Sequence, residues 1–188
     1  MKKYKYISIL FLGAFFFTSC EADRIPKPIN EEEVITTMTL NLIDESTKEM
    51  VTLTSQDLDS DGPDKPVISV SGPLKANTVY KGETILLNET VFPAENIIEE
   101  VKDEGVDHQF FYEFSSGLSA SVQYDDQDEN GDPIGVSFLL ETGSAGMGLL
   151  TATLRHKPDK SAAGVVDGNI QNAGGETDFA QVFDIVIE

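Results

Sequence analysis

The fold is decided by the stretch TTMTLNLI at residues 36–43, in which polar side chains alternate with apolar ones. A second alternating run, MVTLT at residues 50–54, follows after the polar segment DESTK at residues 44–48. Successive side chains of a β-strand point to opposite faces of the sheet, so alternation with period two is typical of a strand with one buried face. The two runs and the turn between them therefore predict an antiparallel β-hairpin.

The same kind of pattern recurs along the rest of the chain. Phe110, Tyr112 and Phe114 share one face of an aromatic run, and clusters of Gly, Asp, Asn or Pro bound each apolar segment. About nine short strands with few helical signals predict an all-β fold, an antiparallel immunoglobulin-like β-sandwich, with a closed barrel of the same strands as the alternative. The predicted strands cover residues 36–43, 50–54, 66–71, 78–88, 109–114, 120–124, 134–140, 148–154 and 179–187.

Two segments fit more than one structure. Behind Pro93, residues such as Ile97 and Val101 have helical spacing, which predicts a short helix near residues 94–104. The same residues also fit an irregular edge strand bent by the proline. Residues 161–175 are rich in Gly and Asn and predict either a binding loop or a disordered segment.

The first twenty residues have the organisation of a lipoprotein signal peptide. Lysines at positions 2, 3 and 5 precede an apolar run at residues 7–17, and the small residues Thr18 and Ser19 precede Cys20. The run is too short for a membrane span, which needs about 20 apolar residues. We therefore expect residues 1–19 to be removed and Cys20 to carry the lipid that anchors the chain to the membrane. The alternative is an ordinary signal peptide followed by an incidental cysteine.

The mature chain divides into a tether and one domain. Residues 20–33 begin with the lipidated cysteine and continue with acidic residues and prolines, which make a charged, stiff spacer with little to bury. Residues 34–188 have the length of a single β-sandwich domain. The signal and the tether together predict a cell-envelope location, as an outer membrane lipoprotein on the periplasmic or the surface face.

The chain is strongly acidic, with a formal net charge of −20 at pH 7. Removal of residues 1–19 takes away three lysines and no acid, so the net charge of the mature chain is −23. This charge argues against binding to nucleic acid, because too few cations remain to neutralise phosphates. Cys20 is the only cysteine, so no internal disulfide can stabilise the domain.

Two acidic segments have the spacing of calcium-binding loops. Residues 57–62 and 126–132 both fit Asp-x-Asp-x-Asp/Asn-Gly, in which alternate oxygens converge on one point and the glycine allows a sharp turn. Neither has the glutamate at the twelfth position that completes an EF-hand. They are therefore either structural Ca²⁺ sites or β-turns that close hairpins. The candidate Ca²⁺ ligands are Asp57, Asp59, Asp61, Asp126, Asp128, Asn130 and Asp132.

The chain has two histidines, and each lies at the end of a predicted strand. His108 follows an acidic run that includes Glu104 and Asp107, and His156 lies after the run at residues 148–154. Two histidines from neighbouring strands can hold Zn²⁺ together with such carboxylates, or bind a haem iron from both sides. Because no HxH or HExxH spacing is present, histidines that are only solvated or hydrogen-bonded are the alternative.

The sequence argues against an enzyme. It has no Gly-x-Ser-x-Gly motif, no phosphate-binding glycine loop and no histidine beside an obvious serine. Its only cysteine is assigned to the lipid, which leaves no cysteine nucleophile. We therefore expect a binding protein.

Six motifs are distributed over nearly all of the mature chain: EEVITT (32–37), DLDSDGP (57–63), LNET (87–90), DHQFF (107–111), LRHKP (154–158) and NAGGETD (172–178). Together they resemble a family of short Bacteroidetes-type lipoproteins of unknown function, often labelled type 1 periplasmic binding fold superfamily proteins and encoded near TonB-dependent receptors. The α/β fold in that label conflicts with the β pattern of this sequence. The resemblance implies a partnership with a TonB-dependent receptor in uptake, but it supplies no functional residues.

Two functions follow from these features. In the first, the protein is a lipid-anchored, ligand-binding protein of the cell envelope that serves TonB-dependent uptake of a metal ion or of a metal complex such as haem. In the second, it is a Ca²⁺-stabilised immunoglobulin-like adhesion or interaction module with a protein or glycan partner. The first requires His108 and His156 in one site, whereas the second requires only the acidic loops.

Overall fold

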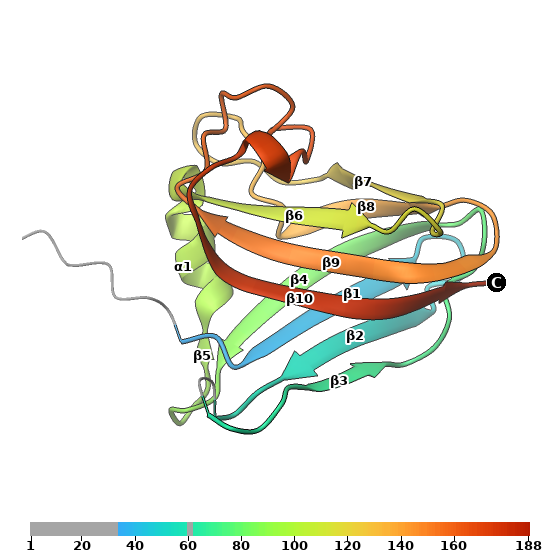
Figure 1. Ribbon diagram of the computed structural model, residues 1–188, viewed down its shortest axis with the longest axis horizontal. Coiled ribbons are helices and arrows are strands. Elements are labelled where there is room, and N and C mark those ends of the chain that lie inside the picture. Colours follow the sequence, from blue (N-terminus) through green and yellow to red (C-terminus); the bar gives the residue numbers. More distant parts are fainter. Residues whose placement is uncertain (1–33, 60–61) are drawn as a thin grey trace, which may run out of the picture. The chain divides into compact units, whose positions relative to one another are not determined.

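The computed structural model describes residues 34–59 and 62–188, which form an all-β sandwich of two antiparallel sheets (Figure 1). The prediction of a β-sandwich is therefore confirmed, with ten strands in these residues. The signal peptide, Cys20, the tether and Asp61 lie outside the described residues. Within the described ranges, no helix has the length and apolar character needed to cross a membrane.

The larger sheet has the strand order β3-β2-β1-β4-β8-β7, with β5 paired to β4 off this path. The predicted hairpin is the β1–β2 pair, in which Leu40 lies opposite Leu53 and both side chains are fully buried. Alternation in the sequence therefore places one face of each strand in the core. The strands are β1 (Thr37–Asp44), β2 (Met50–Gln56), β3 (Val67–Val70), β4 (Val79–Asn88), β5 (Glu95–Asn96), β7 (Ala120–Tyr124) and β8 (Ser137–Thr142).

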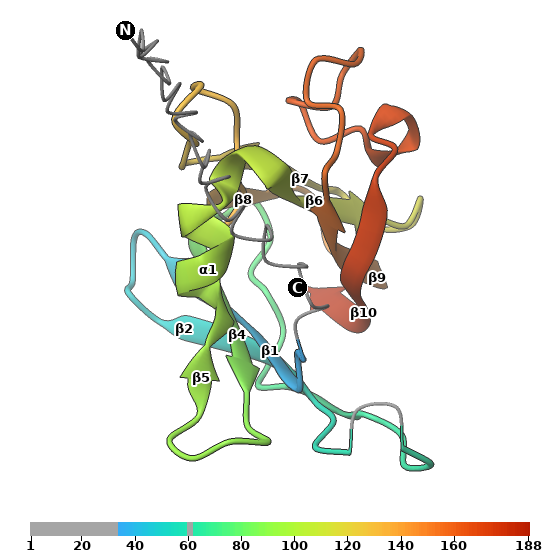
Figure 2. The ribbon, with the colours of Figure 1, turned by 90° about the vertical axis from the view of Figure 1, so that its left-hand side faces the viewer.

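The smaller sheet has three strands in the order β10-β9-β6. They are β6 (His108–Phe114), β9 (Gly146–His156) and β10 (Glu176–Ile187). Phe110, Leu154 and Phe183 from this sheet share one buried cluster with Leu40 and Phe138 from the larger sheet. Figure 2 shows the smaller sheet on the right and β1, β2 and β4 on the left. One apolar core between two sheets is the arrangement expected of a sandwich.

The segment behind Pro93 contains both structures that its sequence allowed. The short strand β5 pairs with β4, and α1 (Ile97–Asp103) follows it directly. The Asn96 side chain caps α1 by accepting a hydrogen bond from the backbone N–H of Ile98. The helix buries three apolar side chains and is followed by a 3₁₀ turn, η1 (Gly105–Asp107), which leads into β6. This connection fixes the position of His108, the first residue of β6.

The glycine-rich segment after β9 is an ordered cover over β6. Phe111 points out of the main core and forms a second buried cluster with Val165 and Ala173 of this segment. The short 3₁₀ helix η2 (Ile170–Asn172) lies within it. The predicted loop is therefore attached to the outer side of the smaller sheet, and it returns the chain to β10 beside the end of β9.

Candidate metal centre

The two histidines lie side by side at one end of the smaller sheet. His108 begins β6 and His156 ends β9, and the antiparallel register places them directly opposite each other. Their rings are stacked, with centroids 5.0 Å apart and an angle of 8° between the planes. The sheet thus brings together two residues that are far apart in the sequence, as a shared site requires.

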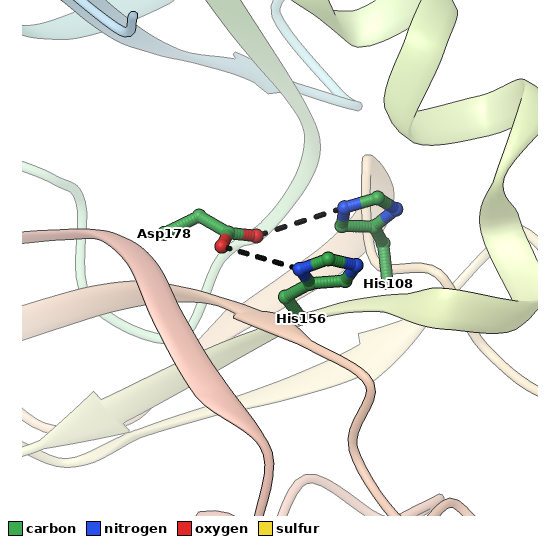
Figure 3. Close-up of side chains that lie close together, drawn as sticks. All are labelled: His108, His156 and Asp178. Carbon is green, nitrogen blue, oxygen red and sulfur yellow. Dashed lines mark ion pairs between the residues drawn. The ribbon is translucent and has the colours of Figure 1, made fainter. Parts of the chain in front are cut away.

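A carboxylate from the third strand completes the cluster. Along β10, Thr177 pairs with Arg155 and Phe179 with Leu154, so Asp178 is an extra residue at an irregularity of the ladder. Its Oδ2 lies 3.6 Å from Nε2 of His108 and its Oδ1 lies 3.8 Å from Nδ1 of His156 (Figure 3). The two imidazole nitrogens therefore lie beside the same carboxylate.

The most buried side chain of the cluster, that of His108, is held in one orientation by the backbone. The side chain of His108 is 1% exposed, and its Nδ1 lies 3.1 Å from the backbone oxygen of Glu104. Burial lowers the pKa of His108, although the contact with Glu104 and the nearby Asp178 act in the opposite direction. A neutral ring that donates from Nδ1 leaves the lone pair of Nε2 directed toward Asp178. This is the protonation state that a metal ligand needs.

The arrangement has the dimensions of a site for one metal ion. One ligand atom from each of His108, His156 and Asp178 lies within 4.8 Å of the others. A tetrahedral Zn²⁺ site with bonds of about 2.0–2.1 Å has edges of about 3.3 Å between ligand atoms. The imidazole–carboxylate distances of 3.6 and 3.8 Å are close to this edge and involve different oxygens of Asp178. Because the ligand atoms lie up to 4.8 Å from one another, the side chains would move inward to bind the ion.

The same geometry does not fit a haem. Two histidines that clamp a haem iron approach it from opposite sides, with their nitrogens facing each other across the metal. Here the two rings are stacked face to face, and the nitrogens of both lie beside Asp178. The cluster therefore favours a single ion over a porphyrin.

The carboxylates singled out next to His108 in the sequence are not in this cluster. Glu104 contributes its backbone oxygen to His108, and the backbone oxygen of Asp107 accepts a hydrogen bond from the N–H of Lys157 at 2.6 Å. Among the described residues, the only group of three potential ligands includes Asp178 instead. Its sequence signal was weak, because only the register irregularity in β10 turns this side chain toward the histidines.

The acidic segment at residues 126–132 forms a turn whose carboxylates accept hydrogen bonds from the protein itself. The Asp126 carboxylate accepts hydrogen bonds from the backbone N–H groups of Gly135 and Ser137. Asp128 accepts from the N–H groups of Asn130 and Asp132. The second oxygen of Asp128 binds the buried ammonium of Lys160 at 2.8 Å. Two of the candidate Ca²⁺ ligands, Asp126 and Asp128, thus accept hydrogen bonds from backbone donors and a lysine, as the turn alternative requires, and the Ca²⁺ site stays a prediction.

The acidic segment at residues 57–62 is only partly described, because Asp61 lies outside the described residues. Asp59 is exposed, and its Oδ2 accepts a hydrogen bond from the N–H of Asp64 at 3.2 Å. Within the described part of the chain, neither Asp57 nor Asp59 belongs to a group of three metal-ligating side chains. The Ca²⁺ site at this segment therefore stays a prediction.

Comparisons of the chain with protein-family models, with curated proteins and with solved structures found no match. What the domain does is therefore inferred from the side chains of the site itself.

Proposed function

We propose that this protein is a metal-binding lipoprotein of the cell envelope that holds a divalent transition metal ion, Zn²⁺ above all, through His108, His156 and Asp178. The observation that carries the proposal is the convergence of these three side chains from three strands, within 4.8 Å of one another. The role we assign is delivery of the metal to a TonB-dependent receptor. The assignment to uptake rests on the signal peptide and on the family resemblance.

The chemistry of the ligands favours Zn²⁺ over Ca²⁺ and Mg²⁺. Imidazole nitrogens suit zinc and other transition metals, whereas Ca²⁺ and Mg²⁺ prefer sites made of oxygen atoms. His108 is buried and bonded to the backbone, so it is oriented before the metal arrives. A preformed ligand lowers the cost of ordering the site.

A cargo role suits the exposure of the site better than a purely structural role. The side chains of His156 and Asp178 are 13% and 17% exposed, so the outer side of the cluster borders solvent. Three protein ligands leave the fourth tetrahedral position for water or for a donor from a receptor, whereas structural zinc sites are closed by four protein ligands. The acidic chain also raises the local concentration of cations.

The decisive experiment is calorimetric titration of Zn²⁺ into protein that begins at Asp23 and carries no histidine tag. The chain has only two histidines, so binding through imidazole can come only from this site. We expect one Zn²⁺ per chain, with affinity lowered at least about tenfold by His156→Ala and by Asp178→Asn. Asp184→Asn, an exposed aspartate on the same strand, is the matched control and should leave the affinity unchanged.

Thermal unfolding with different metals provides an independent test. A ligand at about a hundredfold over its Kd stabilises the folded state by roughly 2.7 kcal/mol. Zn²⁺ should raise the midpoint temperature of unfolding of the unsubstituted protein, but it should not raise that of the His156→Ala variant. Stabilisation by Ca²⁺ alone would contradict metal uptake and favour the adhesion module. An equal response of the parent and His156→Ala to Zn²⁺ would also refute the proposed site.

A further inference from the structure

The two sheets end in four edge strands, and other residues bound or occupy part of three of these edges. The short strand β3 lies between Pro66 and Pro73, which limit the length of any added strand. β10 is bonded to the segment before β4, because the N–H of Leu74 donates to the oxygen of Val186 at 2.8 Å. On β6, the N–H of Phe110 donates to the oxygen of Ile134 at 2.7 Å. The fourth edge, β7, contains neither proline nor a charged residue.

β7 is the last strand of the larger sheet, next to β8 (Figure 1). The hydrogen-bonding pattern with β8 shows which backbone groups of β7 point away from β8. At its two ends, Gly143 N–H donates to Ser119 oxygen at 2.7 Å, and Asp125 N–H donates to Ser137 oxygen at 2.9 Å. In an antiparallel ladder, residues bonded to the partner alternate with residues whose N–H and C=O face away from it. In the described structure, no backbone bond joins these outward groups to another segment. The outward residues are Ala120, Val122 and Tyr124.

Three hollows on the surface follow the same strand. They measure about 280, 200 and 360 Å³, and each includes residues of β7 in its lining. Asp167 contributes to two of them, Asp126 to one of these two, and Glu141 to the third. None of the described residues that line them is basic. An added strand could therefore form hydrogen bonds with the free backbone groups of β7 and place alternate side chains in the hollows. The carboxylates that line the hollows would lie beside these side chains.

We propose that the β7 edge binds an extended, basic segment of a partner protein as an additional strand of the larger sheet. Main-chain hydrogen bonds to the outward residues would give affinity, and lysine or arginine side chains beside Asp126, Asp167 and Glu141 would give specificity. A second copy of this chain is a poor occupant, because the mature chain has a net charge of −23 and pairing would bring two sets of acidic hollows together. This surface is independent of the metal site.

The test is an NMR titration of ¹⁵N-labelled protein that begins at Asp23 with two capped peptides of alternating sequence, KVKVKVK and EVEVEVE. We expect the lysine peptide to shift amide signals along residues 119–125 and to bind roughly tenfold or more tightly than the glutamate peptide. Val122→Pro removes an outward N–H without touching a bond to β8, and should weaken the lysine peptide roughly tenfold. Ile68→Pro changes an exposed, outward residue of β3 and is the matched control.

Several results would overturn the proposal. Equal binding of both peptides, shifts confined to other strands, or no shifts with either peptide would each do so. A dimer in sedimentation that Val122→Pro dissociates would assign the edge to a second copy instead. The amide shifts are measured on the unsubstituted protein, so the proposal stays testable even if the Val122→Pro variant does not fold. An unchanged Zn²⁺ affinity in Val122→Pro, with loss of peptide binding, would support the edge as a separate site.

Discussion

Replacement of Lys160 by methionine should destabilise the domain more than almost any other single change at a charged residue. The ammonium of Lys160 donates to the backbone oxygens of Gly105 at 2.6 Å and Pro133 at 2.9 Å, and to Oδ2 of Asp128 at 2.8 Å. These three bonds join the turn before β6, the turn before β8 and the segment that covers β6. Methionine keeps the apolar stem of the side chain and removes all three bonds.

The expected magnitude follows from what the substitution leaves behind. The side chains of Lys160 and Asp128 are 6% and 1% exposed, so the pair is buried. Breaking a buried ion pair by removing one partner costs about 3–5 kcal/mol, because the remaining charge stays buried without its partner. Two hydrogen bonds from Asn130 and Asp132 remain on Asp128, which places the expected loss at the lower end, about 3 kcal/mol.

Urea unfolding followed by circular dichroism at pH 7 without metal measures this loss. The double variant Asp128→Asn/Lys160→Met leaves no buried charge at this pair, so it should regain part of the stability lost in Lys160→Met. Burial raises the pKa of Asp128, but hydrogen bonds from Lys160 and two backbone N–H groups outweigh it and lower the pKa. The contribution of ionised Asp128 to the free energy of unfolding is therefore present above the ordinary pKa of a carboxyl group. It is lost as the pH falls through the pKa that Asp128 has in the folded protein. A loss below about 1 kcal/mol at pH 7 would refute the reasoning, since that is the size of a surface pair.

Three further changes test other parts of the structure. Gly82→Ala should lower the unfolding free energy by about 1–3 kcal/mol in urea, because its Cβ would lie 2.2 Å from the ring of buried Phe138. Gly175→Ala should destabilise the domain and weaken Zn²⁺ in calorimetry, because its φ is +66° and its Cβ would lie 2.2 Å from the backbone oxygen of His156. Hydrogen bonds from neighbouring side-chain hydroxyls hold the pKa of Asp44 well below its usual range, so acid should lower the unfolding free energy less in Asp44→Asn than in the parent.

The strands were predictable because the sandwich has one buried face per strand. Residues 120–124 were predicted as a strand and form β7, and the alternating run at 36–43 forms β1 with a shift of one residue. Gly82 lies within β4, which passes through it with a continuous register to both neighbouring strands. The glycine is needed because a neighbouring ring occupies the space of its side chain, which depends on packing between strands and not on local sequence.

The candidate site was predictable only in part, for a similar reason. Strand ends and hairpin order can be read locally, so His108 and His156 were plausible neighbours. Asp178 joins the histidine cluster only because of a one-residue irregularity in the pairing of β10 with β9. A shift of one residue moves a side chain to the other face of a strand, and the sequence does not show where such a shift occurs. The two alternatives for the acidic loop at 126–132 could not be separated from the sequence, because the spacing of calcium ligands is also the spacing of a turn whose aspartates accept backbone hydrogen bonds.

The segment before β6 shows why charged residues close to a ligand in sequence need not act through their charges. Glu104, Gly105 and Asp107 each contribute a backbone oxygen, respectively to His108, to Lys160 and to the N–H of Lys157. The segment thus positions the buried histidine through main-chain atoms that no side-chain substitution removes. Glu104→Gln and Asp107→Asn should therefore leave the Zn²⁺ affinity within about twofold in calorimetry, whereas Asp178→Asn lowers it at least about tenfold. A loss with Asp107→Asn as large as that with Asp178→Asn would mean that the carboxylate next in sequence is the ligand, and that the cluster in the structure is not the metal site.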